Sequence, residues 1–251
     1  MLKILLSGCF GKVCRACAAE IEKMADVTVS SGVDICSDLK ADFPTYTTFE
    51  AVEQKPDVII DFSNPSGLDD LLDYCKANSV HVVIATTGYS DEQISKIKAA
   101  SKVIPVFFTF NMSLGVNVLV GLARQAAKIL GDDFDIEIVE KHHNQKIDAP
   151  SGTAIMLADA INGVLDDRMV YEYDRHSRRE KRKRNEIGIH AVRGGTIVGE
   201  HDVIFAGNDE VITLSHSAQS KNLFATGAIK AALYIVDKAP GMYNMETLLN
   251  I

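Results

Sequence analysis

The first 110 residues alternate continuous apolar runs with amphipathic helical segments, and this alternation constrains the fold more than any other feature of the chain. A strand that is apolar along its whole length must be covered on both faces, which is typical of a parallel sheet with helices on either side. The pattern therefore predicts an α/β fold with a doubly wound parallel sheet. The expected strands are 2–7, 27–33, 58–62, 80–85 and 103–110, and the expected helices are 12–25, a segment around 68–75, and 91–100.

From residue 114 the pattern changes to that of an α+β domain. Three β-like runs late in the chain are separated by tight turns at 193–195 and 207–209, which predict antiparallel hairpins. We expect one domain from residues 1–112 together with 217–251, and a second domain from 113–216. The elements expected after residue 113 are helices 114–130, 152–165 and 222–236 and strands 136–140, 187–192, 196–206 and 210–215.

A glycine-containing turn joins the first expected strand to the first expected helix. The glycines of the segment Gly8–Val13 allow the backbone to approach a pyrophosphate, which the helix N-terminus attracts. Position 14, where a third glycine would help the helix to pack on the strand, is a cysteine. In its strand–turn–helix setting, the turn predicts a Rossmann-type dinucleotide site.

An acidic residue follows the second expected strand, where such a residue can bind the ribose hydroxyls of adenosine. This residue is Asp34, and the next is Ile35 rather than an arginine that would accept a 2′-phosphate. We therefore expect NADH to be preferred over NADPH. The alternative is that Asp34 is only a turn residue.

Two later strand ends belong to the same edge of the predicted sheet. In an open parallel sheet, ligands bind at the carboxyl ends of the strands. The segments Ala85–Gly88 and Thr109–Gly115 therefore qualify as cofactor contacts, although either could be an ordinary loop between a strand and a helix.

The densest cluster of reactive side chains lies in residues 140–154, EKHHNQKIDAPSGTA. Its loop holds His142, His143 and Lys146 and ends at a helix capped by Ser151. A histidine can donate or accept a proton near neutral pH, and free backbone N–H groups at a helix N-terminus bind carboxylates. The segment therefore predicts an acid–base centre beside an anion site, the alternative being two histidines in a surface loop. The groups expected to bind carboxylates are the N–H groups of Gly152 and Thr153, the Thr153 hydroxyl and the Lys146 ammonium group. The Arg193 guanidinium is a weaker candidate, because it could equally be a turn residue or a structural salt-bridge partner.

Charge and hydropathy exclude some partners. The formal net charge of −8 disfavours nucleic acid, although the basic run 175–184 leaves that alternative open beside a solvated or substrate-facing loop. No apolar stretch approaches the roughly 18–20 residues of a membrane helix, and the N-terminus does not resemble a signal peptide. We expect a cytoplasmic enzyme with no nucleic-acid or membrane partner.

The five cysteines are expected to be reduced thiols, because their number is odd and the chain shows no secretion signal. Cys14 and Cys17 form a CxxC pair that could bind zinc or act in redox chemistry. No second pair or nearby histidine completes such a site, so we expect both to be small residues on a buried helix face and no metal to be bound.

The segment EKHHNQKIDAPSGTA closely resembles the signature of the 4-hydroxy-tetrahydrodipicolinate (formerly dihydrodipicolinate) reductase family of lysine biosynthesis. The resemblance covers nearly the whole chain and implies hydride transfer from NAD(P)H to the substrate ring, with loss of the 4-hydroxyl as water. It includes the segments GCFGKVCR, DFSNPSG, ATTG, FNMSLGVNVL, EIGIHAVRGGTIVGEHDVIFAG and SKNLFATGAIKAALYI.

The resemblance also implies roles for individual residues. His142 would be the proton donor or acceptor and Lys146 a second proton donor. The substrate carboxylates would be bound by His143, Gly152 and Thr153. The cofactor would be bound by Gly8, Cys9, Phe10, Gly11, Lys12, Val13, Asp34, Ala85, Thr86, Thr87, Thr109, Phe110, Asn111 and Met112.

At the domain level, the resemblance implies that residues 1–112 with 217–251 bind the dinucleotide. Residues 113–216 would bind a small dicarboxylic substrate and assemble a homotetramer. The chain departs from the family at Val13, Cys14 and Ala85, where methionine, glycine and glycine are usual. Two alternatives remain, another two-domain dehydrogenase of a small amino or semialdehyde acid and a non-catalytic NADH sensor, but neither explains the histidine–lysine segment.

Overall fold

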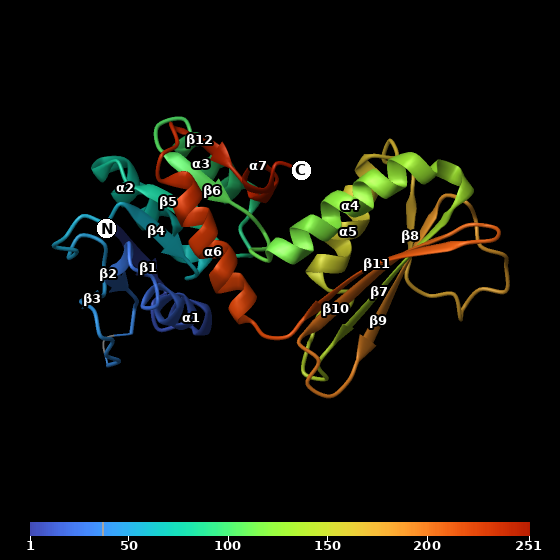
Figure 1. Ribbon diagram of the computed structural model, residues 1–251, viewed down its shortest axis with the longest axis horizontal. Helices are drawn as coiled ribbons and strands as arrows, with labels where there is room; N and C mark the ends of the chain where they lie inside the picture. The colour runs from blue at the N-terminus through green and yellow to red at the C-terminus, as the bar shows by residue number, and fades with distance from the viewer. Residues whose placement is uncertain (37) are drawn as a thin grey trace. The chain divides into compact units, whose positions relative to one another are not determined.

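A computed structural model describes residues 1–36 and 38–251. The chain divides into two compact units (Figure 1). Unit 1 contains Met1–Leu114 and Asn222–Asn250, and unit 2 contains Gly115–Lys221 and Ile251.

Unit 1 is built on a seven-stranded sheet in which all neighbouring strands are parallel, as the sequence predicted. The strand order is β3-β2-β1-β4-β5-β6-β12, so the order reverses between β1 and β4. In a doubly wound sheet this reversal is the point where ligands bind. The strands are β1 (Leu2–Ser7), β2 (Val27–Val33), β3 (Thr45–Tyr46), β4 (Val58–Asp61), β5 (His81–Ile84), β6 (Pro105–Phe108) and β12 (Gly241–Tyr243).

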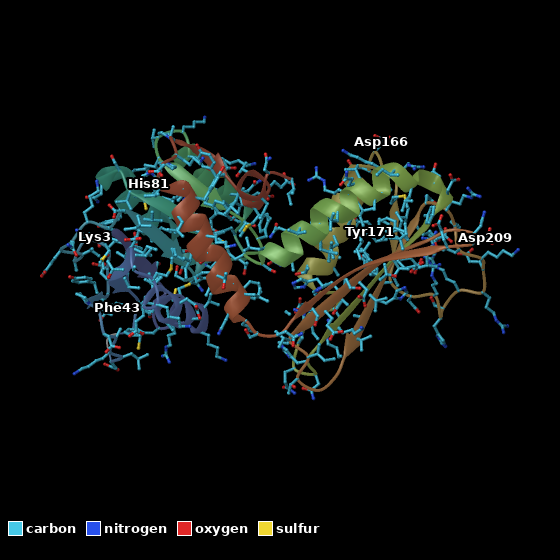
Figure 2. The ribbon with its side chains drawn as sticks, viewed as in Figure 1. Lys3, Phe43, His81, Asp166, Tyr171 and Asp209 are labelled. Atoms are coloured by element: carbon cyan, nitrogen blue, oxygen red, sulfur yellow. The ribbon has the colours of Figure 1, made fainter. Side chains whose placement is uncertain are left out.

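Helices cover both faces of this sheet, which explains why its strands are apolar throughout. In β1, Ile4 and Leu6 belong to one core with residues of α1 and α6, whereas Leu5 belongs to a second core with residues of α2 and α3. Phe43, labelled in Figure 2, packs against the first of these cores. The helices of unit 1 are α1 (Lys12–Ile21), α2 (Leu68–Asn78), α3 (Asp91–Ala100), α6 (Asn222–Ile235) and α7 (Met245–Leu249), with a 3₁₀ turn, η1, at Pro65–Gly67.

Unit 2 is a five-stranded mixed sheet with helices packed on one face. The strand order is β11-β10-β7-β9-β8, in which β7, β8 and β9 run parallel and β10 is antiparallel to both of its neighbours. The elements are α4 (Leu114–Leu130), a 3₁₀ turn η2 (Gly131–Asp133), β7 (Asp135–His142), α5 (Gly152–Gly163), β8 (Val170–Glu172), β9 (Glu186–Arg193), β10 (Gly199–Ala206) and β11 (Val211–Ala218).

Strand pairing in unit 2 corrects two predictions. The turn at 207–209 does join an antiparallel hairpin, β10–β11. The turn at 193–195 does not, because β7 lies between β9 and β10 and pairs with both. The residues of that turn bond instead to the segment at the end of β7, where Gly194 donates to the His142 carbonyl and Asn144 donates to the Gly195 carbonyl.

The second correction concerns the length of β7. We expected this strand to end at Glu140 and His142 to lie in a loop, but the strand continues through His142. His142 pairs with Arg193 at the end of the parallel ladder with β9. The candidate catalytic histidine is therefore held by a sheet rather than by a flexible connection.

Candidate active site

The turn after β1 requires glycine at its first position. Gly8 has φ +76°, and a Cβ there would lie 2.7 Å from the carbonyl oxygen of Phe62. The Gly11 N–H donates to the Gly8 carbonyl at 2.9 Å, and Lys12 begins α1 directly afterwards. A tight turn thus presents its backbone at a helix N-terminus, which is the arrangement that binds a pyrophosphate.

Asp34 lies beside this turn, where the sequence predicted it. Its carboxylate accepts hydrogen bonds from the backbone N–H groups of Phe10 at 3.0 Å and Cys36 at 3.1 Å. Asp34 therefore fixes the end of β2 against the glycine turn. The neighbouring Ile35 is 96% exposed.

Cys14 and Cys17 lie on the buried side of α1, and both are fully buried free thiols. Burial raises the pKa of Cys17 to about 12, and it raises the pKa of Cys14 well above the usual value. The Cys14 thiol donates to the Ser7 carbonyl at 3.3 Å. These contacts favour the structural interpretation of the CxxC pair, because thiolates are needed for metal binding and redox chemistry.

A buried carboxylate that the sequence analysis missed joins three strands at the carboxyl edge of the unit 1 sheet. Asp61 accepts hydrogen bonds from the hydroxyls of Ser7 at 2.7 Å, Ser63 at 2.6 Å and Thr86 at 2.6 Å. Burial raises the pKa of Asp61, and these hydroxyls partly oppose the shift. Of the two threonines after β5 that were expected to contact the cofactor, Thr86 therefore directs its hydroxyl inward, whereas Thr87 is exposed.

The second predicted strand end, 109–112, also contains both exposed and buried side chains. Phe110 is 60% exposed, while Met112 is buried in the core of unit 1. The Thr109 hydroxyl hydrogen-bonds with the backbone N–H and carbonyl of Asn111, which stabilises a compact turn. Phe110 can therefore offer its side chain to a ligand, but the Met112 side chain cannot.

In unit 2, His142 lies against a buried carboxylate at the end of β7. The His142 Nδ1 is 2.6 Å from Oε2 of Glu140, whose side chain is fully buried. Arg193 donates from both terminal nitrogens to this carboxylate at 2.8 Å, and the Ser151 N–H donates to it at 3.0 Å. Burial alone would raise the pKa of Glu140, but these hydrogen bonds outweigh it and the pKa lies below its usual value.

These contacts decide the role of Arg193. Its terminal nitrogens also donate to the backbone carbonyls of Val192 and Asp148. The suggestion that Arg193 supplies charge to a substrate is thus not supported, and its alternative as a structural ion-pair partner describes the observed contacts.

A second buried histidine completes this cluster. His201 lies on β10 opposite Glu140, and its Nε2 is 3.0 Å from the Ser151 hydroxyl. The rings of His201 and His142 meet edge to face with their centroids 5.2 Å apart. Burial lowers the pKa of His201 to about 4, with a smaller contribution from His142, so His201 is neutral at physiological pH.

The N-terminus of α5 adjoins the same cluster. The Ser151 hydroxyl accepts from the Ala154 N–H at 3.2 Å and caps the helix as expected. Gly152 is exposed, and no heavy atom lies within 4 Å of the position that its Cβ would take. The Lys146 ammonium group pairs with Asp148 at 2.8 Å and is close enough to contribute to the low pKa of His201.

His142 at the end of β7, Arg193 and the N-terminus of α5 thus all contact the Glu140 carboxylate. Sequence reasoning missed Glu140 and His201 as site residues. Glu140 precedes His142 by two positions, so a strand extended through His142 would have placed both side chains on one face. His201 gave no local signal, because its position depends on the register of β10 against β7.

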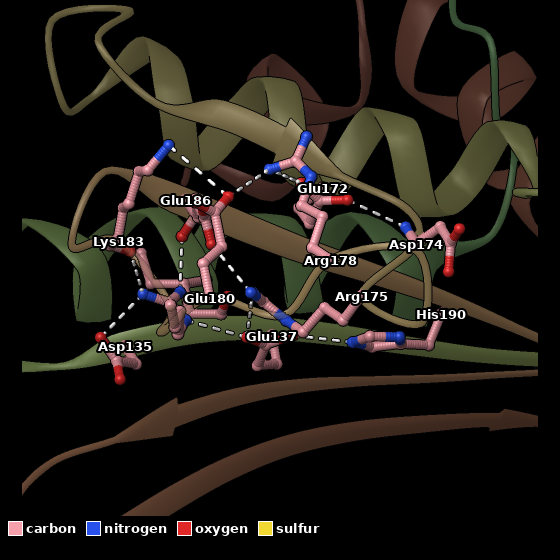
Figure 3. A network of polar contacts seen from close by, with 12 residues as sticks. Asp135, Glu137, Glu172, Asp174, Arg175, Arg178, Glu180, Lys183, Glu186 and His190 are labelled. Atoms are coloured by element: carbon pink, nitrogen blue, oxygen red, sulfur yellow. Dashed lines mark hydrogen bonds and ion pairs between the residues drawn. The ribbon is translucent and has the colours of Figure 1, made fainter.

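The basic segment 175–184 forms an ion-pair network within unit 2 (Figure 3). Arg175 pairs with Glu186 at 2.9 Å and with Glu137 at 3.2 Å, and Arg178 pairs with Glu172 at 2.6 Å. Arg182 likewise pairs with Asp135 and Glu137. Several of the cations that suggested a nucleic-acid patch are therefore bound to carboxylates of the protein's own sheet.

Comparison with known proteins decides the family. The model of the dihydrodipicolinate reductase N-terminus matches residues 2–112, and the model of the C-terminus of the same family matches residues 115–249. The chain belongs to the dihydrodipicolinate reductase family. The family prediction made from the segment 140–154 is therefore confirmed, and with it the prediction of an oxidoreductase.

Similar proteins extend over the full chain. The 4-hydroxy-tetrahydrodipicolinate reductase of Caldanaerobacter subterraneus subsp. tengcongensis is 51% identical over 249 residues, covering 99% of this chain and 98% of the relative. That of Clostridium tetani is 47% identical over 250 residues, covering 100% and 98%. The fold matches a dipicolinate-bound dihydrodipicolinate reductase from Paenisporosarcina sp. TG-14, with a TM-score of 0.83, 24% identity and 98% of each chain covered.

Across residues 1–36 and 38–251, no group of three or more histidine, cysteine, aspartate or glutamate side chains is arranged to hold a metal ion. Over the same residues, none of the helices combines the length and the apolar character that crossing a membrane requires.

Proposed function

We propose that this member of the dihydrodipicolinate reductase family reduces 4-hydroxy-tetrahydrodipicolinate to tetrahydrodipicolinate in lysine and diaminopimelate biosynthesis, using NAD(P)H and releasing water. The observation that carries the proposal is the buried Glu140–His142 pair beside the open N-terminus of α5. The proposal is also supported by relatives named 4-hydroxy-tetrahydrodipicolinate reductase that align over nearly the whole chain.

The glycine turn of unit 1 fits a nicotinamide dinucleotide. A side chain at Gly8 would collide with the Phe62 carbonyl, so the turn stays narrow and leaves its backbone open to a pyrophosphate at the start of α1. A nicotinamide bound there supplies a hydride to the substrate ring. The residues assigned to hold the dinucleotide are Gly8–Val13, Asp34, Ala85–Thr87 and Thr109–Met112, with Thr87 and Phe110 offering exposed side chains.

Unit 2 supplies the substrate site and the protons. The backbone N–H groups of Gly152 and Thr153, together with His143 and Lys146, bind the two carboxylates of the substrate. His142 exchanges a proton with the substrate ring, and Lys146 is a second proton donor. A cationic and hydrogen-bonding site of this kind stabilises the charge that develops as an unsaturated imine is reduced.

The activity is tested by generating the substrate in situ from pyruvate and aspartate semialdehyde and following NADH absorbance. We expect the purified protein to oxidise NADH only when both precursors have been converted. A protein that binds NADH but gives no turnover with this substrate would contradict the proposed function and would leave a nucleotide sensor as the better description.

We further propose that NADH is preferred over NADPH, because the Asp34 carboxylate would repel a 2′-phosphate. Wild type should show the higher kcat/KM with NADH. Asp34→Asn keeps an oxygen that accepts from the Phe10 N–H but removes the charge, so it should raise the NADPH/NADH ratio of kcat/KM roughly fivefold, given about 1 kcal/mol between charges 4 Å apart in water. The control is Asp26→Asn, which should leave the ratio unchanged because Asp26 is exposed and precedes β2, at the edge of the sheet opposite the glycine turn. A wild type that strongly prefers NADPH would refute this assignment.

We also propose that the chain works as a cytoplasmic homotetramer assembled through unit 2. The sheet face opposite α5 carries the exposed side chains of Val192 and Val211, which are 45% and 62% exposed, and five free thiols suit a reducing compartment. Sedimentation equilibrium should give four times the chain mass of 27.4 kDa. A mass of one chain at micromolar concentration would contradict the tetramer.

A further inference from the structure

The Glu140 carboxylate is occupied on both oxygens, although it has no place in the proton transfer itself. Oε1 accepts from the Ser151 N–H and from Arg193 Nη2, while Oε2 accepts from Arg193 Nη1 and lies 2.6 Å from His142 Nδ1. Three of these contacts come from groups that hold the carboxylate in place. The fourth is the His142 imidazole, whose ring nitrogens donate or accept according to the tautomer.

The sheet fixes this geometry through register. Glu140 and His142 are two residues apart on β7, so both side chains lie on the face of the sheet that carries the core of unit 2. Arg193 lies opposite His142 on β9, and His201 lies opposite Glu140 on β10. Partners on three adjacent strands thus enclose the imidazole.

The opposite edge of the imidazole is bounded more loosely. Gly199 begins β10 beside it, and a Cβ at this position would lie 3.0 Å from His142 Nε2. The His142 side chain keeps 11% of its surface exposed. The absence of a side chain at Gly199 therefore leaves room at the Nε2 edge, while the Nδ1 edge is closed by Glu140.

We propose that Glu140 is a positioning residue for His142: it accepts the Nδ1–H and so leaves Nε2 as the nitrogen that exchanges a proton with the substrate. This inference rests on the proposed function for the identity of that substrate. Arg193 and the Ser151 N–H keep Glu140 ionised and in place. The His201 ring packs edge to face against the His142 ring.

His201 supports this arrangement because it remains neutral. A second imidazolium 5.2 Å away would compete for the carboxylate and repel a charged His142. The low pKa of His201, about 4, removes that competition throughout the physiological range. His201 also hydrogen-bonds with the Ser151 hydroxyl that caps α5. A single residue therefore contacts both the helix cap and the His142 ring.

The test combines a spectroscopic and a kinetic measurement on the full-length protein. Long-range ¹⁵N–¹H correlation spectra of histidine-labelled wild type should show neutral His142 as the Nδ1–H tautomer, assigned by loss of its signals in His142→Gln. Glu140→Gln should shift that tautomer balance and lower kcat roughly 10- to 100-fold, no more than the roughly 10²–10⁴-fold contribution of a general acid or base because the imidazole itself is kept, with KM changing less than about threefold.

Glu137→Gln is the matched control, because Glu137 lies on the same strand and also pairs with arginines and a histidine, but on the other face of the sheet. It should leave the His142 tautomer and kcat unchanged. An Nε2–H tautomer in wild type, an unaltered tautomer and kcat in folded Glu140→Gln, or an equal loss of kcat in Glu137→Gln would each overturn the proposal. If Glu140→Gln fails to fold, the wild-type spectrum decides.

The two proposals can fail separately. The tautomer is read from the protein alone and does not depend on turnover. The expected tautomer in a protein that does not reduce the substrate would support the positioning of His142 and contradict the proposed function.

Discussion

Replacing His142 with glutamine is expected to lower kcat roughly a hundredfold or more, because the variant loses the imidazole to which we assign the proton exchange with the substrate. Glutamine keeps a similar size and can still hydrogen-bond to Glu140, so folding should be preserved. Lys146→Ala should lose a comparable factor if the ammonium group is the second proton donor. Initial rates of NADH oxidation with saturating substrate measure both effects.

His190→Gln is the control for this experiment. His190 also pairs with a glutamate of β7, Glu137, at 2.7 Å, but it lies on the opposite face of the sheet from His142. Its replacement should leave kcat near the wild-type value. An effect of His142→Gln on KM alone, with kcat intact, would mean that the imidazole binds the substrate and does not take part in proton transfer.

Replacing Arg193 with methionine is expected to reduce the free energy of unfolding by about 3–5 kcal/mol, which is the usual result of leaving a buried charge without its partner. The partner is Glu140, which is fully buried and receives both terminal nitrogens of Arg193. Urea denaturation followed by circular dichroism at neutral pH measures the change. Arg168→Met, which removes an exposed ion pair with Asp132, should cost about 1 kcal/mol or less.

The Arg193 effect should depend on pH in a defined direction. Because the folded protein lowers the pKa of Glu140 below 4.5, this carboxylate contributes stability above the pKa of the unfolded chain and loses it as pH falls through the folded pKa. The difference between wild type and Arg193→Met should therefore be largest near pH 7 and shrink below about pH 4.5. A difference that is constant with pH would mean that Arg193 contributes through packing and not through charge.

Much of the fold was predictable because its main signals are local. The strand Leu2–Ser7, the helix Leu114–Leu130 and the helix Asp91–Ala100 were predicted with the bounds that the structure has, since each is long and strongly patterned. The strands β3 and β12, of two and three residues, were not predicted because pairing with a neighbour, and not sequence pattern, stabilises them.

The same difference between local and distant signals explains which site residues were predicted. His142, Lys146 and the Ser151 cap are close in sequence, so a single segment indicated an acid–base centre beside an anion site. Glu140 was missed because β7 was expected to end at this residue. With His142 assigned to a loop, nothing indicated that the two side chains lie on the same face of a strand. The roles of Arg193 and His201 depend on strands 50 or more residues away, and their register could not be obtained from periodicity.

A crystal structure of the protein with dipicolinate, a planar dicarboxylate that resembles the substrate, would show directly whether the end of β7 and the N-terminus of α5 form the substrate site. We expect one carboxylate within hydrogen-bonding distance of the Gly152 and Thr153 N–H groups, with Lys146 and His143 as further partners and the Nε2 edge of His142 toward the ring. A dicarboxylate bound away from the α5 N-terminus, or an imidazole turned from it with Nδ1 released by Glu140, would refute the proposed site.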